Sequence, residues 1–383
     1  MTRRQNGEGS ITILKNGKVR VRVEVEPANG KRQWLSATAD TKKEALKKLR
    51  GLLRAKEDKK YIKKTQKTYK DAVKEYLEYK KPRVKPTTYQ CSAQILNKSC
   101  ELLGELPIHS IKTPEIETLI LLWQASNNSS SSIQSKLIRL KNFIKWAIKQ
   151  KMLLEDPIVF EDLPDIQPVK KKKVEVLSAD EHKRIREYLL EAYKVFKEKP
   201  VWELRNRMYP LYLVAYETGM RRGEILGLKW KSVDFEKNQI HVDNNLIFIN
   251  KQGIMDTTPK SDAGFRSILI SQGLTDILRE LKGLYDKYGY KSEYVFGHDK
   301  TGFCPAYMTT LFTDILRKVG ITRDFSFHDI RHTNASIMIH NGVDDAVITE
   351  RLGHSSIVIT LTTYAHVYNG IKQRQAALVD ATQ

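Results

Sequence analysis

The sequence predicts a multidomain α+β protein in which three modules follow one another. The first is a small three-stranded β-sheet plus one helix, the second is all-α, and the third is mainly α with a small antiparallel sheet. Three observations predict this order. Apolar and polar residues alternate strictly near the N-terminus, helical periodicity begins at Thr68, and β-rich segments recur between about 240 and 270. A chain of 383 residues has room for two or three domains.

Composition limits the classes of protein to which the chain can belong. Hydrophobic residues make up 40% of it, which is enough for packed cores and excludes wholesale disorder. The longest apolar runs are far shorter than the ~18–20 residues of a membrane span, and no secretory signal is visible at the N-terminus. The three cysteines match neither a zinc ribbon nor a disulfide framework. We therefore expect a cytoplasmic protein with reduced thiols and no membrane partner.

The chain carries a formal net charge of +21, most of it in the first 173 residues. Residues 1–60 hold 17 Lys and Arg against 7 Asp and Glu, residues 61–173 hold 21 against 12, and the remainder holds 28 against 26. A basic excess of this size favours a polyanionic partner. Its distribution indicates DNA-binding modules that precede a nearly neutral unit.

The first module is expected at residues 1–58. Two β-rich segments, 10–14 and 18–25, flank Asn16-Gly17, which is a strong signal for a two-residue hairpin. In the second segment valines alternate with charged residues, which predicts a half-buried strand with a basic outer face. A third strand is expected over residues 33–38.

A helix is expected after the third strand. Thr41 and Glu44 form a capping box, and the apolar residues that follow recur at helical spacing. A sheet backed by one helix can lay its exposed face in the major groove of DNA. The pattern alone would also fit another kind of small α+β module.

The second module is expected at residues 64–165, as about four helices. Pro82 and Pro86 separate the first two helices, and Thr113-Pro114 gives the third an N-cap followed by a proline. The fourth helix carries apolar residues on one face and lysines on the others. The lysine run 170–173 in the next linker either tracks a phosphate backbone or is simply solvated.

The third module is expected at residues 174–383. Ser178 and Glu181 form another capping box, and helices are predicted over 180–227. Three β-rich segments follow, and helices resume at about Gly273 and continue to the end. The β-rich segments are 240–242, 245–250 and 266–270.

Four short stretches of this module carry residues suited to chemistry on phosphates. Glycines flank Arg221-Arg222 at a turn between helices, where a guanidinium can be presented to an anion. Lys260 lies near the tip of a turn between predicted strands. His328 and Arg331 are three residues apart and share one helical face. The fourth stretch, 352–366, holds a glycine, histidines and a tyrosine.

These stretches, in this order and at these separations, resemble the tyrosine recombinase (phage integrase) family. The resemblance covers roughly residues 175–370, and the preceding modules are similar to those of integrases from phages and conjugative transposons. By the family pattern Tyr364 is the nucleophile, and Glu224 supports the first arginine. The catalytic pocket would consist of Arg221, Lys260, His328, Arg331 and His354.

The chemistry of phosphodiester cleavage explains the arginines. Without a metal ion the protein itself must neutralise a phosphorane that carries two negative charges. Arg221 and Arg331 can bind its non-bridging oxygens bidentately, and His354 can donate a further hydrogen bond. No cofactor and no metal are expected.

Proton transfer explains the remaining residues. A tyrosine hydroxyl has a pKa near 10, so it must lose its proton as it attacks. We expect His328 to accept the proton of Tyr364, and Lys260 to donate one to the departing 5′-oxygen. The product is a 3′-phosphotyrosyl link that conserves bond energy, so strand exchange needs no ATP.

The resemblance implies a site-specific recombinase that integrates or excises a mobile genetic element. Its expected partner is double-stranded DNA, with arm sites bound by the first module and core sites bound by the SAM-like second module. A homotetramer on DNA, a directionality factor and a host DNA-bending protein are also expected. The tail after Asn369 is expected to be a short helix that docks on a neighbouring protomer or on its own domain.

Two other functions are consistent with some of these residues. A type IB topoisomerase-like relaxase would use the same pocket, but the arm module argues against it. A non-catalytic architectural DNA-binding protein would keep the fold, but the complete set of catalytic candidates argues against it. His332, His340 and Tyr368 are neighbouring residues of the same types. A metal site formed from His328, His332 and His354 lacks carboxylate or cysteine ligands at suitable spacing.

Overall fold

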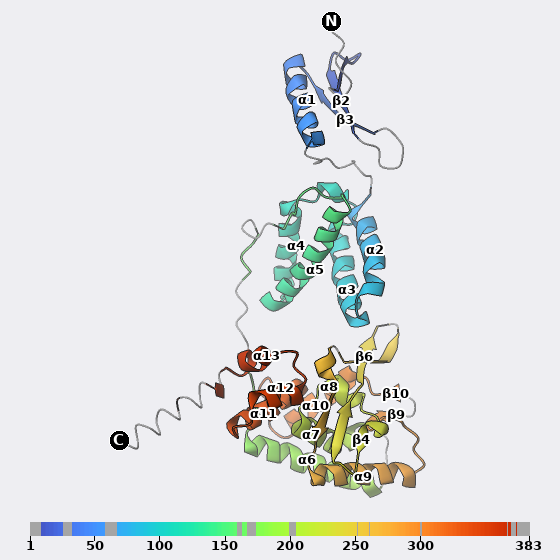
Figure 1. Cartoon of the computed structure of the whole chain (residues 1–383), viewed down its shortest axis with the longest axis vertical. Coiled ribbons are helices and arrows are strands. Elements are labelled where there is room, and N and C mark those ends of the chain that lie inside the picture. Colours follow the sequence, from blue (N-terminus) through green and yellow to red (C-terminus); the bar gives the residue numbers. More distant parts are fainter. Residues whose placement is uncertain are drawn as a thin grey trace, which may run out of the picture. The chain divides into compact units, whose positions relative to one another are not determined.

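A computed structural model describes most of the chain, which divides into two compact units, Met1–Lys170 and Lys171–Gln383 (Figure 1). Each unit is treated separately below. The described residues are 9–25, 33–57, 67–158, 163–166, 174–198, 204–250, 252–259, 261–298, 301–365, 367–368 and 373.

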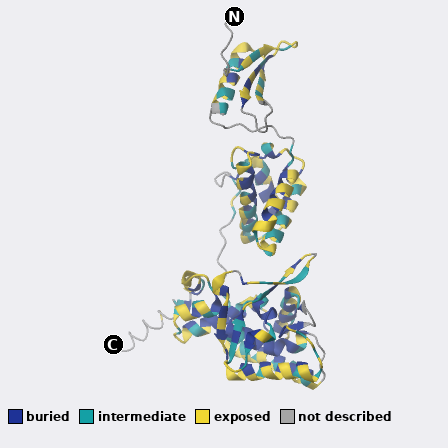
Figure 2. Cartoon of the chain, turned by 45° about the vertical axis from the view of Figure 1, so that its right-hand side comes forward, coloured by how far each residue is buried: buried dark blue, intermediate teal, exposed yellow. Residues whose placement is uncertain are grey.

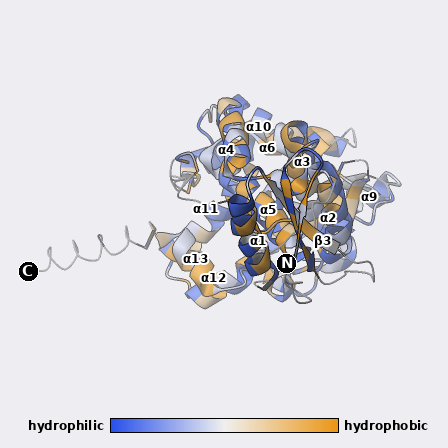
Figure 3. Ribbon diagram, turned by 90° about the horizontal axis from the view of Figure 1, so that it is seen from above, coloured by the Kyte–Doolittle hydropathy of each residue, from blue (hydrophilic) through white to orange (hydrophobic). Residues whose placement is uncertain are grey.

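The first unit begins with a three-stranded antiparallel sheet, in which β2 (Val19–Val25) lies between β1 (Ser10–Ile13) and β3 (Gln33–Ala39). The valines of β2 are buried against α1 (Lys42–Glu57), whereas the residues between them are accessible. This confirms the predicted alternation and the single helix. Hydrophilic residues dominate the outer surface of α1 (Figure 3).

Four helices with a separate hydrophobic core form the second part of this unit. Phe143 is fully buried there and packs edge to face on Tyr69, with ring centroids 5.4 Å apart. The third helix begins at Thr113, but its N-cap is Lys112 rather than the predicted Thr113, because Glu115 accepts the Lys112 N–H. The helices are α2 (Tyr69–Lys80), α3 (Pro86–Leu103), α4 (Thr113–Ala125) and α5 (Ser130–Lys149).

The module boundaries remain predictions. Residues 58–66 and most of 159–173 lie outside the described residues, and the expected borders fall in or beside them.

The second unit is mainly helical and is built around α7 (Met208–Thr218). Every residue from Met208 to Ala215 is buried, so this helix is the centre of the largest core (Figure 2). The other helices of this unit are α6 (Ala179–Glu198), α8 (Arg222–Leu226), α9 (Gln272–Lys287), α10 (Pro305–Lys318), α11 (Phe327–His340), α12 (Asp345–Leu352) and α13 (Ile357–Thr363).

Short antiparallel strands flank this helical core. β4 (Val233–Asp234), β5 (Gln239–Val242) and β8 (Arg266–Leu269) form one sheet. β6 (Asn245–Ile249) and β7 (Gly253–Thr257) form a hairpin that extends away from the body of the unit (Figure 1).

Two parts of the predicted strand pattern are wrong. β7 was not predicted, because its residues are nearly all half-buried and show no alternation. The expectation of uninterrupted helices after Gly273 also fails, since β9 (Gly297–His298) pairs with β10 (Thr301–Gly302). Strands of two residues carry no periodic signal that a sequence could display.

Membrane spans were searched among the described residues. None of their helices is both long and apolar enough to cross a membrane.

Candidate active site

Two glycines with left-handed backbone shape the candidate site. Gly219 ends α7 with φ 63°, and Gly353 ends α12 with φ 63°. A Cβ at Gly219 would lie 2.8 Å from the Asn334 Oδ1 atom, and one at Gly353 would lie 2.8 Å from the Ala263 carbonyl oxygen. Only glycine combines this conformation with such close packing.

Arg221 lies directly after the first of these turns, at the N-cap of α8. Its Nη1 atom donates to Glu224 Oε1 at 2.8 Å, and its Nη2 atom donates to the Gly353 carbonyl at 2.8 Å. The Arg221 side chain is still 37% exposed. It is therefore oriented by the protein and accessible to a ligand.

Arg331 of α11 is only 3% exposed and is held by the same two turns. Its guanidinium donates to the Gly219 carbonyl at 2.8 Å and to the Leu352 carbonyl at 2.5 Å. Burial, followed by the positive charge of Arg221, lowers its pKa to about 9. No carboxylate among the described residues forms an ion pair with Arg331, so part of its charge is uncompensated.

Glu224 and Arg266 form a buried ion pair that supports Arg221. Arg266 Nη2 donates to Glu224 Oε2 at 2.9 Å, and the two side chains are 2% and 3% exposed. Burial by itself would raise the pKa of Glu224. The hydrogen bond from Arg266 and the charges of Arg266 and Arg221 outweigh it and hold that pKa below its ordinary value.

Arg266 also joins separate parts of the pocket. Its Nε atom donates to the Arg351 carbonyl at 2.7 Å, and Nη1 donates to the Gly264 carbonyl at 3.0 Å. One side chain thus connects the end of α12 with the loop after β7. No sequence motif indicates a role for Arg266, because its partners lie 2, 42 and 85 residues away.

Lys260 belongs to that loop but lies outside the described residues. Its neighbourhood is nevertheless placed. The backbone approach of Ala263 to Gly353 and the bond from Arg266 to Gly264 hold the loop beside the turn that precedes His354.

His354 follows this turn. Its Nδ1 atom lies 2.8 Å from Thr360 Oγ1, which in turn lies 2.9 Å from Thr349 Oγ1. Burial and the charges of Arg331 and Arg221 lower the pKa of His354 to about 4. Its imidazole is therefore neutral at pH 7 and retains one N–H donor.

His328 lies at the start of α11 and is exposed at the surface of the unit. Loss of water around its imidazole, followed by the charges of His332 and Arg331, lowers its pKa to about 4. The ring of His328 lies edge to face with that of His332, with centroids 5.1 Å apart.

Tyr364 is completely buried at the end of α13. Burial raises its pKa to about 12, although the positive charge of Arg331 acts in the opposite direction. Its hydroxyl oxygen lies 2.8 Å from His332 Nδ1. His328 was predicted to accept the proton of this hydroxyl, but the structure places His332, and not His328, against it.

The structure thus brings together most of the predicted site. Arg221, Arg331 and His354 meet at the end of α12, and Glu224 supports them. Among the described residues, no group of three or more His, Cys, Asp or Glu side chains could hold a metal ion. Arg221 and Arg266 share the Glu224 carboxylate, and Arg331 adds a third guanidinium with no ion pair of its own to any described residue, so the pocket is prepared for an anion.

The fold and this pocket define a class of enzyme, one that transfers phosphoryl groups and offers arginines, neutral histidines and a tyrosine for the task. Two family models match the chain. "Phage integrase, N-terminal SAM-like domain" matches residues 68–123, and "Phage integrase family" matches residues 175–370, which is just over half of the chain. The chain belongs to the phage integrase family and is a tyrosine recombinase, an enzyme of site-specific DNA recombination.

Individual proteins agree with this assignment. The chain is 26% identical over 381 residues to the ICEBs1 integrase of Bacillus subtilis (strain 168). The matched region covers 97% of this chain and 99% of that protein. A structure of the Tn1549 transposon integrase with a circular intermediate DNA has a TM-score of 0.64 at 18% identity, covering 80% of this chain and 99% of that chain. A lambda integrase tetramer bound to a Holliday junction has a TM-score of 0.56 at 16% identity, covering 94% and 96%. Both structures share the fold.

Proposed function

We propose that this recombinase cleaves and rejoins DNA strands through a 3′-phosphotyrosyl link at Tyr364, in order to integrate or excise a mobile genetic element. The observation that carries the proposal is the convergence of Arg221 and Arg331 on the Gly219 and Gly353 turns. Arg331 donates to the carbonyl that precedes the Arg221 motif helix, and both guanidiniums donate to carbonyls at the end of α12. Glu224 pairs with Arg221 and Arg266 but not with Arg331, which leaves a surplus of positive charge.

This surplus fits the charge that develops during cleavage. A phosphorane carries two negative charges, and preorganised donors stabilise it most where water is excluded. We assign Arg221 and Arg331 to its non-bridging oxygens. His354 is neutral at pH 7, and it adds a hydrogen bond without adding a fourth positive charge to the pocket.

The two proton transfers are assigned to His328 and Lys260. His328 is assigned to accept the proton of Tyr364. Its pKa of about 4 keeps the imidazole unprotonated at neutral pH, so a ring nitrogen is available as an acceptor. Lys260 is assigned to protonation of the departing 5′-oxygen. The loop that carries it is tied to the pocket through Arg266.

We further propose that the N-terminal sheet binds arm-type DNA sites. Arg20 and Arg22 alternate with the buried valines of β2, so both lie on the face that α1 does not cover. Thr38 pairs with Arg20 in the sheet register, and the exposed Trp34 lies on the same face. Cations beside hydroxyl and aromatic groups suit phosphates and base edges.

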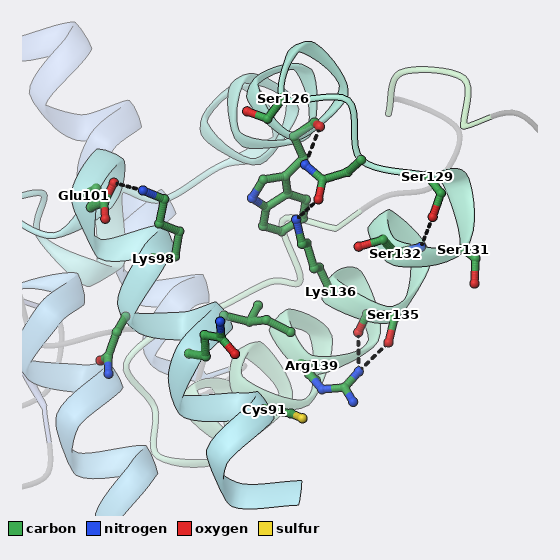
Figure 4. A pocket seen from close by; sticks show the side chains of 15 residues that line it. Cys91, Lys98, Glu101, Ser126, Ser129, Ser131, Ser132, Ser135, Lys136 and Arg139 are labelled. Atoms are coloured by element: carbon green, nitrogen blue, oxygen red, sulfur yellow. Dashed lines mark hydrogen bonds and ion pairs between the residues drawn. The ribbon is translucent and has the colours of Figure 1, made fainter. Parts of the chain in front are cut away.

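The helical module is proposed to bind the core site. A groove lies between α3 and the first half of α5 (Figure 4). Its walls carry Lys136, Arg139 and Lys98, and Lys98 forms an ion pair with Glu101 of the same wall. Arg139 is oriented by Ser135, whose carbonyl it reaches at 2.7 Å. Burial lowers the pKa of Lys136, which lies over the Trp123 ring and donates to Asn128 Oδ1. Several serines complete a lining of hydrogen-bonding groups suited to a phosphate backbone.

The proposed assembly is supported by a related structure. The lambda integrase structure is a tetramer on a Holliday junction, and the ICEBs1 and Tn1549 relatives are integrases. We propose a homotetramer on two duplexes, in which a directionality factor and a host DNA-bending protein select integration or excision.

The proposal is tested with a nicked core-site duplex from the ends of the element that carries the gene. The nick lets the short fragment that carries the released 5′-hydroxyl diffuse away. Rejoining is then impossible, so cleavage traps a covalent protein–DNA adduct. The intact chain is expected to form the adduct, and Tyr364→Phe is expected to form none. Tyr368→Phe is the matched control and should retain it. An undiminished adduct from Tyr364→Phe, or relaxation of supercoiled DNA regardless of sequence, would overturn the proposal.

A further inference from the structure

Tyr364 is enclosed by the protein in this structure. Its exposed fraction is 0%, and it belongs to a cluster of buried residues that includes Ile339, Leu352 and Val367. An attacking oxygen must come within ~3–3.5 Å of the phosphorus. A hydroxyl without accessible surface cannot do so, and the structure therefore shows a resting arrangement of this side chain.

His332 supplies a polar contact inside the enclosure. Its Nδ1 atom lies 2.8 Å from the Tyr364 hydroxyl, and the two rings meet edge to face with centroids 5.6 Å apart. A buried hydroxyl without a hydrogen-bond partner is costly. This contact consequently stabilises the enclosed position over one in which Tyr364 has left.

The chain after Tyr364 is attached to the unit as well. Val367 is buried, and the Tyr368 hydroxyl donates to Asp345 of α12. The backbone N–H of Val367 donates to the Tyr364 carbonyl at 2.9 Å. The apolar cluster and these attachments hold the segment, while His332 holds the reactive atom itself.

The two histidines of α11 have different surroundings. His328 is exposed, whereas His332 is partly buried and contacts Tyr364. Arg331, between them, donates to two backbone carbonyls. Of the two histidines, His332 is therefore the one placed to control the position of the Tyr364 hydroxyl.

We propose that His332 is a positioning residue that holds Tyr364 in the enclosed position until DNA is bound. This inference rests on the proposed function, because it takes Tyr364 as the nucleophile. No covalent bond forms or breaks in this step. DNA binding shifts an equilibrium between the enclosed and the released tyrosine, and the contact with His332 sets the fraction released in the free protein.

The enclosed position is tested on the full-length protein without DNA. Tetranitromethane nitrates accessible tyrosines, and peptide mapping reports Tyr364 separately from the others. His332→Phe keeps a ring but removes the hydrogen-bond partner, and it is expected to raise the nitration rate of Tyr364 about tenfold. His332→Gln retains a partner and should raise it less. His340→Gln, at the exposed end of the same helix, is the control and should leave it unchanged.

Single-turnover cleavage of the nicked duplex supplies the second measurement. Loss of the contact in His332→Phe is expected to speed adduct formation several-fold, because more of the free enzyme has a released tyrosine. His332→Leu, which also lacks the partner, should behave alike if His332→Phe fails to fold.

Two results would overturn the proposal. One is an unchanged nitration rate of Tyr364 in the folded His332→Phe or His332→Leu chain. The other is a fall in adduct formation of tenfold or more, which would make His332 the proton acceptor instead. If the unaltered chain forms no adduct at all, the proposed function fails, whereas the nitration rates still report whether His332 holds Tyr364.

Discussion

At the scale of single residues, Glu224 determines how the charges of the pocket are balanced. The Glu224 carboxylate is buried and accepts hydrogen bonds from Arg221 and from the buried Arg266. Its negative charge also acts on Arg331, whose pKa it raises. Removing one member of a buried ion pair is more harmful than replacing the pair, because it leaves an uncompensated charge. The pocket can keep three guanidiniums only while this carboxylate is present.

Glu224→Gln is therefore expected to destabilise the protein by about 3–5 kcal/mol, as measured by urea denaturation. Glu187→Gln is the matched control. Glu187 faces Lys183 at the surface, 4.0 Å away, and its loss should cost at most about 0.5 kcal/mol. Equal effects of the two substitutions would contradict the role given to Glu224.

Stability should also depend on pH through His328 and His354. Both have pKa values of about 4 in the folded chain, below the ordinary 6.5, so the unfolded chain binds their protons first as the pH falls. The contribution of these two histidines to the free energy of unfolding is therefore fully present above pH 6.5 and is lost between pH 6.5 and 4.

The measurement is the loss of melting temperature between pH 7 and pH 5. A chain with both His328→Gln and His354→Gln is expected to lose ~4–8 °C less than the unaltered chain, after allowance for the solvent exposure of His328. His340→Gln, at the exposed end of α11, serves as the control and should lose as much as the unaltered chain. Identical losses in all three proteins would show that these histidines do not titrate as described.

At the scale of elements, the central strand of the N-terminal sheet separates packing from binding. Its valines pack on α1, while Arg20 and Arg22 remain on the opposite face. Because strand side chains alternate, the two functions occupy one short segment without competing for the same positions.

Replacing both Arg20 and Arg22 by Ala in the full chain is expected to weaken binding to duplex DNA about tenfold. The slope of log K against log salt should fall by about two, because two phosphate contacts are lost. Fluorescence anisotropy over a salt series measures both values. Lys43→Ala combined with Lys47→Ala removes the same charge from α1. If that control has the larger effect, the sheet is not the binding face.

Periodic elements could be predicted from the sequence, whereas irregular ones could not. The β2 strand and the long helices show repeated apolar positions, and the helices begin at predicted capping residues, such as Thr41 and Ser178, whose hydrogen bonds the structure contains. β7 has no alternation because its side chains are half-exposed on both faces of a projecting hairpin.

The candidate site shows the same division. Motif spacing identified Arg221, Arg331 and His354, and the structure brings them together at the turn that ends α12. Arg266 and His332 were missed because their importance depends on tertiary packing. The rotation of α11 decides which of its histidines contacts Tyr364, and no local pattern reports that rotation.

At the scale of the whole molecule, charge and chemistry are separated along the chain. The first 173 residues hold most of the net charge of +21, while the second unit is nearly neutral and places Arg221, Arg266 and Arg331 in one pocket. Affinity for DNA and stabilisation of the reacting phosphate should therefore respond to different changes.

Deletion of residues 1–60 tests this separation. The shortened chain is expected to lose binding to arm-site duplexes by tenfold or more and to retain covalent cleavage of the nicked core site. A mobility-shift assay measures the first property, and the adduct on a denaturing gel measures the second. Loss of both would contradict the assignment of separate arm-binding and core-binding modules.

The central claim is that Tyr364 becomes covalently joined to DNA. Its most direct measurement is mass spectrometry of the protease- and nuclease-digested adduct formed on the nicked duplex. We expect the nucleotide remnant on the peptide that contains Tyr364, joined through a 3′-phosphate to the phenolic oxygen. A remnant on Tyr368 or on any other residue, or a link to a 5′-phosphate, would contradict the account.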